Sequence, residues 1–414
     1  MSIQFQTENE NYLSPSVSYS LEYIWMDANN KFRSKVKVIT IKKLKSIDDL
    51  KPHLEIWNFD GSSTGQASTN ESEVFIKPFR YFKNTENKIY FYVLCECLNP
   101  NGTPHKTNTR SSVSQYFKQE NIKDLDIMFG IEQEFFVFKK GIPLVWNNKT
   151  DNNNTTDITD NNKTNLTDIT DNKTEAQGDY YCGNGAKSIE GREYLNKVVD
   201  VLTNIGINIT GYNFEVAPGQ MEIQICHKGI DACDYLIASR FILTRLAEER
   251  GWDIDFSPKP TFLNTPNWNG SGCHVNISTK QMRDNDIIKE ESVLNPLYKT
   301  SQLITKMKEN HTRDIASFGT ELNKLRLTGI NETSSYDKFT YGIAHRGCSI
   351  RIPRSFVKNL KGYIEDRRPS SDMDPYIVCK ILASYLLETN TEENKEEIKK
   401  ISMEIIDKHY LDTF

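Results

Sequence analysis

The run MFGIEQEFFVF, residues 128–138, determines how the rest of the chain is interpreted. Apolar residues dominate it, which is typical of a strand, yet it carries two glutamates, Glu132 and Glu134. Side chains two positions apart in a strand emerge on the same face. Neighbouring carboxylates on a buried strand repel each other and lose hydration, which a divalent cation between them would offset. The pattern therefore indicates either a metal site or an edge strand with a solvated acidic face.

A second pair of carboxylates occurs in YNFEVAPGQMEIQI, residues 212–225. Pro218 and Gly219 predict a turn, with Glu215 on the strand before it and Glu222 on the strand after it. A hairpin can return both carboxylates to one side. The run predicts either two further metal ligands or a surface hairpin with acidic faces.

The segment NWNGSGCHVNIS, residues 267–278, places Gly270 and Gly272 before His274 and then alternates Asn276 and Ser278 along an expected strand. Glycine allows the backbone to approach a ligand closely, and one histidine beside carboxylates suits a mixed metal site. A lone histidine is more often structural. Five candidate ligands in separate motifs nevertheless strengthen the metal interpretation of each.

Arginines follow in three motifs, RLTGINETS (326–334), HRGCSIRIPR (345–354) and GYIEDRRPS (362–370), beside isolated acids such as Glu332 and Glu365. Guanidinium groups match carboxylate and phosphate oxygens, so an anionic substrate is one interpretation. Ordinary surface arginines are the other.

One motif of nucleotide-binding sites is missing from the sequence. It contains no G-x-x-x-x-G-K-[ST], so a P-loop is not expected. Carboxylates, one histidine and arginines are the residue types of metal-assisted phosphoryl transfer.

The chain is expected to have an α+β fold with two domains. Short β-rich runs precede residue 104, so we place an N-terminal extension at 1–20, a small β-rich domain at 21–104 and a larger catalytic domain at 105–414. Residues 147–177 are almost entirely Asn, Thr and Asp, which predicts a disordered insertion.

Hydrophobic spacing locates three helical regions in the larger domain. Leu195, Val198, Val199 and Leu202 recur at helical spacing before Gly206, and the run INIT after that glycine reads as a strand. A second helix is expected from about Ala232 to Arg250, and a helical tail after Asp374.

Composition excludes several functional classes. The net charge of -5 and the lack of a dense basic run argue against nucleic acid as a partner. The longest apolar stretch is too short to span a membrane, and the first residues lack a signal-peptide pattern, so a cytoplasmic location is expected.

The chain has eight cysteines and no C-x-x-C pair, so we expect the cysteines to be buried, reduced thiols. Cys95 and Cys97 are expected on one face of a strand.

Taken in order, these motifs resemble glutamine synthetases of the eukaryotic type, from about Leu21 to Glu388. The resemblance rests on YIWMD, WNFDGSST, GIEQE, YYCGNGA, FEVAPGQMEIQ, NWNGSGCHVNIS, RLTG, NETS, SIRIPR and GYIEDRRPS. It implies a β-grasp-like N-terminal domain and a catalytic domain with a curved antiparallel sheet flanked by helices. One departure is Asn331, where this family type usually has histidine.

The resemblance also implies a reaction and an assembly. The reaction is the ATP-dependent condensation of glutamate with ammonium through γ-glutamyl phosphate, serving nitrogen assimilation and ammonia detoxification. The assembly is a homo-oligomer of stacked rings, a decamer by family analogy, with each active site between adjacent subunits.

Roles carry over motif by motif. The implied ligands of Mg²⁺ or Mn²⁺ are Glu134, Glu215 and Glu222 near glutamate, and Glu132, His274 and Glu365 near the ATP phosphates. The implied glutamate-binding residues are Asn269, Gly270, Arg326, Arg346 and Arg367. The implied ATP-binding residues are Asn276, Ser278, Arg283, Arg351 and Tyr363, with Arg351 also stabilising the transferred phosphoryl group. Asp60 is expected to bind and deprotonate ammonium, and Glu332 to close over the intermediate.

Two alternatives use the same scaffold. A catalytically silent member would be expected to lack metal ligands, Asp60 or Glu332, and all of them are present. A ligase that joins glutamate to another amine is the other alternative, against which Asp60 argues because it suits a small cation.

Overall fold

The computed structural model describes residues 16–145, 180–185, 189–260, 269–283, 295–388 and 391–413. The expected insertion at 147–177 lies outside these ranges, as do residues 1–15 of the expected N-terminal extension. The chain divides into two compact units, Met1–Ser111 and Ser112–Phe414. The break thus follows Ser111 rather than residue 104.

The first unit contains a five-stranded sheet in the order β2-β1-β5-β4-β3. Its strands are β1 (Ser16–Met26), β2 (Phe32–Lys42), β3 (Trp57–Asp60), β4 (Glu73–Lys83) and β5 (Tyr90–Leu98), with 3₁₀ helices η1 (Ile47–His53) and η2 (Gly61–Thr64). β1 and β5 are parallel, and the other pairs are antiparallel. Because β1 begins at Ser16, residues 16–20 belong to the sheet and not to an extension.

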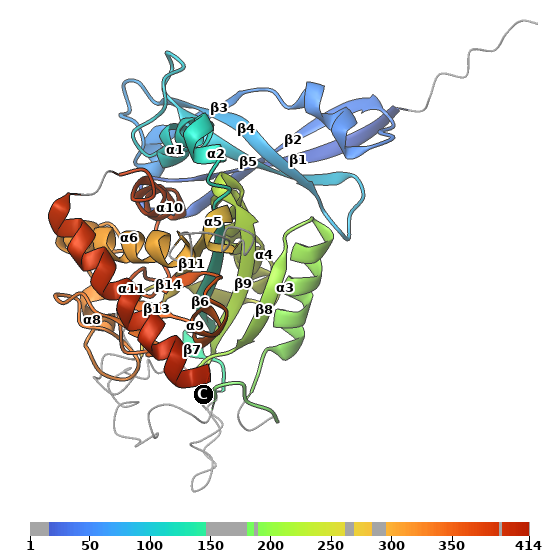
Figure 1. Ribbon diagram of the computed structural model, residues 1–414. Helices are drawn as coiled ribbons and strands as arrows, with labels where there is room; N and C mark the ends of the chain where they lie inside the picture. The colour runs from blue at the N-terminus through green and yellow to red at the C-terminus, as the bar shows by residue number, and fades with distance from the viewer. Residues whose placement is uncertain are drawn as a thin grey trace, which may run out of the picture. The chain divides into compact units, whose positions relative to one another are not determined.

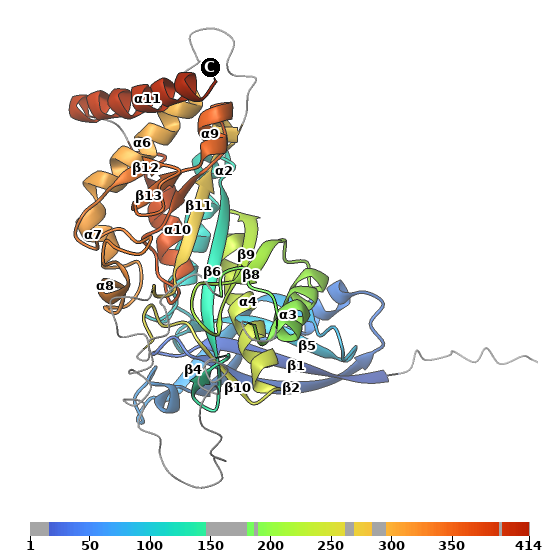
Figure 2. The same ribbon diagram turned by 90° about the horizontal axis from the view of Figure 1, so that it is seen from below.

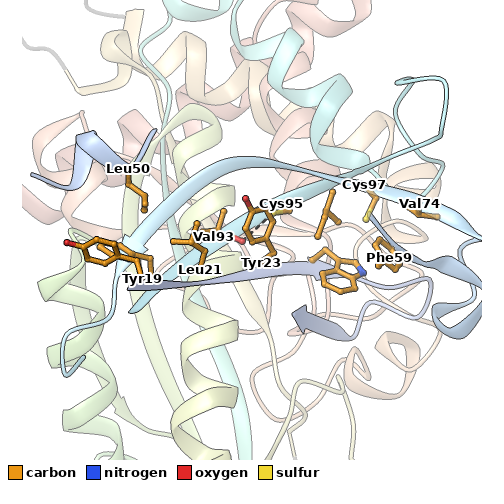
Figure 3. Close-up of a cluster of buried hydrophobic side chains, with 12 residues drawn as sticks. Tyr19, Leu21, Tyr23, Leu50, Phe59, Val74, Val93, Cys95 and Cys97 are labelled. Carbon is orange, nitrogen blue, oxygen red and sulfur yellow. Dashed lines mark hydrogen bonds between the residues drawn. The ribbon is translucent and has the colours of Figure 1, made fainter. Parts of the chain in front are cut away.

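Alternation along the strands builds the core of this sheet (Figure 3). Tyr19, Leu21 and Tyr23 point to one face of β1 and pack with residues of β5 on the same face. Cys95 and Cys97 belong to this core, which confirms their prediction as small buried side chains.

The second unit is built on a nine-stranded sheet in which β6 (Met128–Lys139) is the longest strand. The main order is β12-β13-β14-β11-β6-β9-β8, and β7 and β10 also pair with β6 (Figures 1 and 2). The other strands are β7 (Ile142–Pro143), β8 (Ile209–Phe214), β9 (Gln220–Lys228), β10 (Trp252–Asp255), β11 (Cys273–Ser278), β12 (Tyr341–Ile343), β13 (Ile350–Ile352) and β14 (Ile364–Asp366). The pairs are antiparallel as expected, except that β12 and β13 are parallel.

Helices pack around this sheet as the hydrophobic spacing requires. α4 (Gly229–Glu248) packs against β6, β9 and β10, and α3 (Arg192–Asn204) packs against α4 (Figure 1). α10 (Pro375–Ser384) also contacts α4, and α11 (Glu392–Thr413) contacts α6 (Asn295–Glu309) and α9 (Arg354–Asn359). The remaining helices are α1 (Thr109–Phe117), α2 (Glu120–Lys123), α5 (Lys280–Arg283), α7 (His311–Ile315) and α8 (Asn323–Arg326).

The predicted helices and strand are present with shifted ends. α3 covers the expected helix, α4 starts before Ala232 and stops before Arg250, and the INIT strand begins at Ile209. Within the described residues, no helix combines the length and apolar character that crossing a membrane requires.

Candidate active site

The register of the large sheet brings distant motifs into adjacent rows on one face. On β6, Glu132 is opposite His274 of β11, and Glu134 is opposite Glu222 of β9. In the neighbouring row, Glu365 of β14 is opposite both Asn276 of β11 and Arg351 of β13. Seven motif residues from five strands therefore lie on three neighbouring rows.

Glu132, His274 and Glu365 form a cluster in which one ligand atom from each lies within 4.8 Å of the others. His274 Nδ1 is 3.5 Å from Glu132 Oε2 and 3.6 Å from Glu365 Oε1. These are the three residues predicted to hold one cation near the ATP phosphates. Their oxygen and nitrogen donors suit Mg²⁺ or Mn²⁺, which prefer carboxylates and accept imidazole.

Glu134, Glu215 and Glu222, the second predicted ligand set, line one cavity but converge less closely in the described structure. A turn returns Glu222 beside Glu215, as the hairpin predicts, with the Gln220 N–H donating to the Ala217 carbonyl. Glu215 lies one position beyond the end of β8 and donates its backbone N–H to the Gln220 carbonyl, 2.9 Å away.

Burial makes these three carboxylates costly to ionise in the protein alone. It raises the pKa of Glu134 to about 8, with a smaller contribution from the charge of Glu215. It also raises the pKa of Glu215 to about 7, and burial together with the neighbouring carboxylates raises the pKa of Glu222. A bound divalent cation would offset both the lost hydration and the mutual repulsion, so this donor set fits a metal.

His274 is prepared as a neutral ligand. Burial lowers the pKa of His274 well below its usual value, and the charge of Arg367 lowers it further. A neutral imidazole keeps a free electron pair for a cation. His274 is therefore better suited to bind a metal ion than to carry a positive charge.

Three arginines line the same cavity as the carboxylates. Arg326 is 4% exposed, and its Nη2 donates to the carbonyls of Arg367, Arg368 and Pro369. Arg367 Nη1 donates to Glu365 Oε1 at 2.6 Å, while Arg346 is exposed. Burial lowers the pKa of Arg326 to about 10, which leaves it cationic at neutral pH.

These groups surround a cavity of about 310 Å³. All five predicted glutamate-binding residues, five of the six predicted metal ligands and Glu332 line it. The full lining is Glu132, Glu134, Tyr181, Glu215, Val216, Gln220, Glu222, Asn269, Gly270, His274, Arg326, Leu327, Glu332, Thr333, Ser334, Arg346 and Arg367. The cavity thus brings together groups that can bind a cation and groups that can bind an anion, and its volume suits a small molecule.

Two glycines of the 267–278 motif leave this space open. A Cβ on Gly272 would lie 2.6 Å from His274 Nε2 and 3.0 Å from Arg326 Nη1. A Cβ on Gly270 would lie 1.8 Å from the Pro258 carbonyl oxygen. Both glycines therefore lie where a side chain would clash with other parts of the protein, and their close approach to a ligand stays a prediction.

None of the five residues expected on the nucleotide side is in the described cavity lining, and two of them, Arg351 and Asn276, contact the Glu132 cluster. Arg351 Nη1 donates to Glu365 Oε2 at 2.6 Å, and Asn276 Nδ2 donates to Glu132 Oε1 at 2.8 Å. Arg283 is already paired with Asp126, 2.8 Å away, and with the Ser278 hydroxyl, and Tyr363 is 42% exposed.

Asp60, the expected ammonium-binding residue, belongs to the first unit. Its carboxylate caps η2 by accepting hydrogen bonds from the Ser62 N–H and the hydroxyls of Ser62 and Ser63. These bonds lower the pKa of Asp60, so it remains an exposed anion. Within the described unit it performs the turn-forming role that Asp-Gly alone predicts.

Glu332 lies in a strained segment of the cavity wall. Asn331 and Glu332 both have left-handed backbone, with φ of 51° and 64°, and the Glu332 carbonyl accepts a bond from Arg367 Nη2 at 3.2 Å. Asparagine tolerates this conformation, which gives a physical reason for its presence at 331.

Sequence analysis missed several residues of the cavity lining, Gln220 among them, and two supports behind the cavity. Gln220 is 1% exposed, and its Nε2 donates to Glu134 Oε2 at 3.0 Å, so it holds that carboxylate in place. Gln220 is two positions before Glu222, and the period-two rule applied to Glu132 and Glu134 would have found it.

The two supports are buried arginines. Arg368 and Asp366 form a fully buried ion pair at 2.7 Å, on the opposite side of the chain from Glu365 and Arg367. Arg240 Nε of α4 donates at 2.7 Å to the side chain of Gln133, which separates the two site glutamates of β6. Both networks fix the backbone from which site residues project.

Similarity to known proteins agrees with these features. Residues 106–387 match the model of the glutamine synthetase catalytic domain. Glutamine synthetases of Saccharomyces cerevisiae and Yarrowia lipolytica are 38% and 40% identical over 367 and 368 residues, about 87% of this chain and 87% and 88% of theirs. A protein of Pinus sylvestris named glutamine synthetase cytosolic isozyme is 36% identical, over 87% of this chain and 92% of its own.

A solved structure titled "Apo GmaS without ligand" shares the fold. It superposes with a TM-score of 0.62 at 16% identity, covering 92% of this chain and 78% of that one. The family match over most of the large unit and the extensive identity to yeast and plant relatives together show that this chain belongs to the glutamine synthetase family.

Proposed function

We propose that the protein joins glutamate and ammonia into glutamine at the expense of ATP, through a γ-glutamyl phosphate intermediate. The observation that carries this proposal is one cavity of about 310 Å³ that is lined by carboxylates, a neutral histidine and three arginines. Such a site can hold divalent cations and an anionic amino acid together.

Two divalent cations, Mg²⁺ or Mn²⁺, are part of the proposal. Glu132, His274 and Glu365 would hold one, and Glu134, Glu215 and Glu222 the other. When bound, the ions supply positive charge that neutralises phosphate and carboxylate oxygens. The raised pKa values of Glu134 and Glu215 support this assignment, because such a carboxylate cluster is costly without a cation.

The chain's own residues would bind and orient the substrates. Arg326, Arg346 and Arg367, with Asn269 and Gly270, would hold glutamate, and the guanidinium groups would orient its carboxylates. The ATP-binding residues would be Asn276, Ser278, Arg283, Arg351 and Tyr363. Arg351 would stabilise the negative charge of the transferred phosphoryl group.

The proposed reaction has two steps. A γ-carboxylate oxygen of glutamate attacks the terminal phosphorus of ATP and ADP leaves, which gives the acyl phosphate. Asp60 accepts a proton from ammonium, the resulting ammonia attacks the acyl carbon, and inorganic phosphate leaves with the oxygen of the former carboxylate. Glu332 would cover the intermediate and exclude water, which would otherwise hydrolyse it.

We further propose that the site is completed between subunits of a ring assembly, a decamer of stacked rings. The described residues that line the cavity all belong to the second unit, whereas Asp60 belongs to the first.

The proposal also assigns a β-grasp-like fold to the first unit, which its central parallel pair β1–β5 supports. It includes a cytoplasmic location, in keeping with the name of the pine relative.

A direct assay tests the activity. Purified protein with glutamate, ATP, Mg²⁺ and ammonium is expected to release glutamine and phosphate in equal amounts. Omitting ammonium should stop glutamine formation. Phosphate release without an amide product, or ligation of another amine in preference to ammonium, would contradict the proposal.

Divalent cations should stabilise the protein more strongly as pH rises. The folded-state pKa values of Glu134 and Glu215, about 8 and about 7, lie above those of an unfolded chain, so the folded protein binds more protons. Metal-free stability is therefore highest below the unfolded pKa and falls as pH rises through about 7 and 8. A cation displaces those protons, so its affinity gains about tenfold per pH unit for each proton released.

Thermal unfolding with and without excess Mg²⁺, near about pH 6 and about pH 8, measures this effect. The increase in Tm should be larger at the higher pH, and a variant with Glu134→Gln and Glu215→Gln should lose most of the difference. Equal increases at both pH values would show that these carboxyls release no proton to the metal.

A further inference from the structure

Side-chain amides hold the three carboxylates of the second predicted ligand set. Each of these carboxylates accepts a hydrogen bond from one asparagine or glutamine. The three bonds are Gln220 Nε2 to Glu134 Oε2 (3.0 Å), Asn213 Nδ2 to Glu215 Oε1 (2.8 Å) and Gln224 Nε2 to Glu222 Oε1 (2.7 Å). Within the described residues no lysine or arginine forms an ion pair with these three carboxylates, whereas Glu365 of the other set is paired with Arg351 and Arg367 at 2.6 Å. The second set is therefore held by neutral donors.

Two adjacent strands deliver these amides to the face that carries the glutamates. Gln220, Glu222 and Gln224 occupy alternate positions of β9, so their side chains share a face. Asn213 of β8 is opposite Glu222 in the register, which places it on that face as well. Gly211 of β8 makes room for Gln224, because a Cβ at this glycine would lie 2.6 Å from Gln224 Oε1. The arrangement is thus built into the pairing of β8 with β9.

The amide bonds orient the carboxylates and leave oxygens available. Glu134 Oε2 also accepts a bond from the Gly272 N–H at 2.8 Å, so two donors fix that oxygen. The other oxygens of Glu134 and Glu222 receive no hydrogen bond within the described residues, and neither is a buried atom without a partner, so both remain accessible in the cavity. Glu215 is held at both oxygens, since the Val216 N–H donates to Oε2 at 3.2 Å, but each oxygen keeps a second electron pair. All three carboxylates can therefore still bind a cation.

Neutral donors suit the ligands of a cation better than charged donors do. A carboxamide N–H orients a carboxylate without bringing a positive charge. An ammonium or guanidinium group in the same place would repel a divalent cation bound nearby. Hydrogen bonds from such outer residues to metal ligands raise metal affinity, and their loss typically costs about ten- to a hundredfold.

We propose that Asn213, Gln220 and Gln224 are positioning residues, which hold the second ligand set ready for its divalent cation without a competing positive charge. This inference rests on the proposed function and adds to it three residues that contact the ligands of the cation. They raise the affinity of this one site and leave the cluster of Glu132 unaffected.

The sharpest test replaces Gln224, whose side-chain amide donates only to Glu222 within the described residues. Gln224→Met keeps the length of the side chain but removes the donor. Of the two expected Mn²⁺ sites, one should weaken about tenfold, and the other should stay within about twofold of wild type. Titration of the protein with Mn²⁺, with the free ion measured by electron paramagnetic resonance, determines both affinities without turnover.

Gln224→Lys separates positioning from a merely structural role. The substitution adds a positive charge beside Glu222, so it should weaken the same Mn²⁺ site further than Gln224→Met does. The new ion pair offsets repulsion among the carboxylates, so the Tm of the metal-free protein should be at or above that of wild type. Loss of a residue that only stabilises the fold would lower the Tm and leave the Mn²⁺ affinity of the folded protein unchanged.

Asn394→Leu is the matched control. Asn394 Nδ2 donates to the Glu309 carboxylate, outside the cavity lining, so its loss should lower the Tm but leave both Mn²⁺ affinities unchanged. Asn213→Leu and Gln220→Met should weaken the same site as Gln224→Met, and Asn213→Leu takes its place if Gln224→Met does not fold. Unchanged Mn²⁺ affinity in all three amide variants, or an equal loss in the control, would overturn the inference while leaving the proposed function in place. Failure of the wild-type protein to bind Mn²⁺ would instead overturn the proposed function.

Discussion

Glu134→Gln should lower the rate of glutamine formation by about a thousandfold, which corresponds to roughly 4 kcal/mol of transition-state stabilisation. The substitution keeps the size of the side chain but removes a charge from the proposed metal set. It also relieves repulsion in a cluster where burial and Glu215 raise the pKa of Glu134. The variant should therefore be at least as stable as wild type in the absence of metal.

His274→Ala should be similarly inactive for a different reason. His274 belongs to the cluster with Glu132 and Glu365, whereas Glu134 is opposite Glu222 in the sheet. We expect Glu134→Gln chiefly to weaken glutamate binding and His274→Ala chiefly to weaken nucleotide binding. Titration of each variant with each ligand separates the two effects.

A matched control is Glu22→Gln. Glu22 is a buried carboxylate of the first unit that accepts bonds from Ser34 and Tyr90, and it lies outside the cavity lining. Its substitution should leave activity near wild type. Unchanged affinity for both ligands in Glu134→Gln and His274→Ala would contradict the assignment of two separate metal sets.

Activity should reappear when two inactive variants are mixed in one assembly. In the proposed ring, Asp60 of one subunit and Glu332 of its neighbour serve the same site. Asp60→Asn keeps a residue that can cap η2 but removes the anion, and Glu332→Ala removes the acid of the cavity wall. Neither variant alone should form glutamine at more than about a hundredth of the wild-type rate.

Co-expression of the two variants at equal levels gives a quantitative expectation. With random mixing in a head-to-tail ring, about a quarter of the sites should combine an intact Asp60 with an intact Glu332, and activity should recover to about that fraction. Asp49→Asn is the control, because Asp49 is another exposed carboxylate of the first unit that accepts backbone bonds, from Lys45 and Ser46. Proven mixed assemblies that stay inactive would show that the two residues do not share a site across subunits.

Local patterns in the sequence predicted which carboxylates share a face or a side of the fold. Period-two spacing placed Glu132 and Glu134 on one face, and the Pro-Gly turn brought Glu215 and Glu222 together, as the structure confirms. These predictions depend only on neighbours in the chain, whose geometry strand and turn conformations determine.

The arrangement between motifs could not be predicted in the same way. That Glu132 is opposite His274 depends on which strands pair and in what register, which is a property of the whole sheet. The burial that shifts the pKa of His274, and the hydrogen bond from Gln220 to Glu134, likewise arise only after distant segments pack. Family resemblance supplied the expected roles of these residues, but not their contacts.

The parts that sequence analysis placed wrongly have a simple cause. The N-terminal extension was expected to reach residue 20, and the domain to begin at Leu21. In the structure Ser16–Ser20 already pair with β2, although three of these five residues are serines. Polar composition alone therefore does not mark the start of a domain.

The most direct test of the central claim follows an oxygen atom. Glutamate labelled with ¹⁸O in its γ-carboxylate is supplied with ATP, Mg²⁺ and ammonium, and the released phosphate is analysed by mass spectrometry. If γ-glutamyl phosphate forms, the oxygen that attacked phosphorus leaves with it, so each phosphate should carry one labelled atom. Glutamine formation with unlabelled phosphate would contradict the account, because it would show that the carboxylate was never phosphorylated.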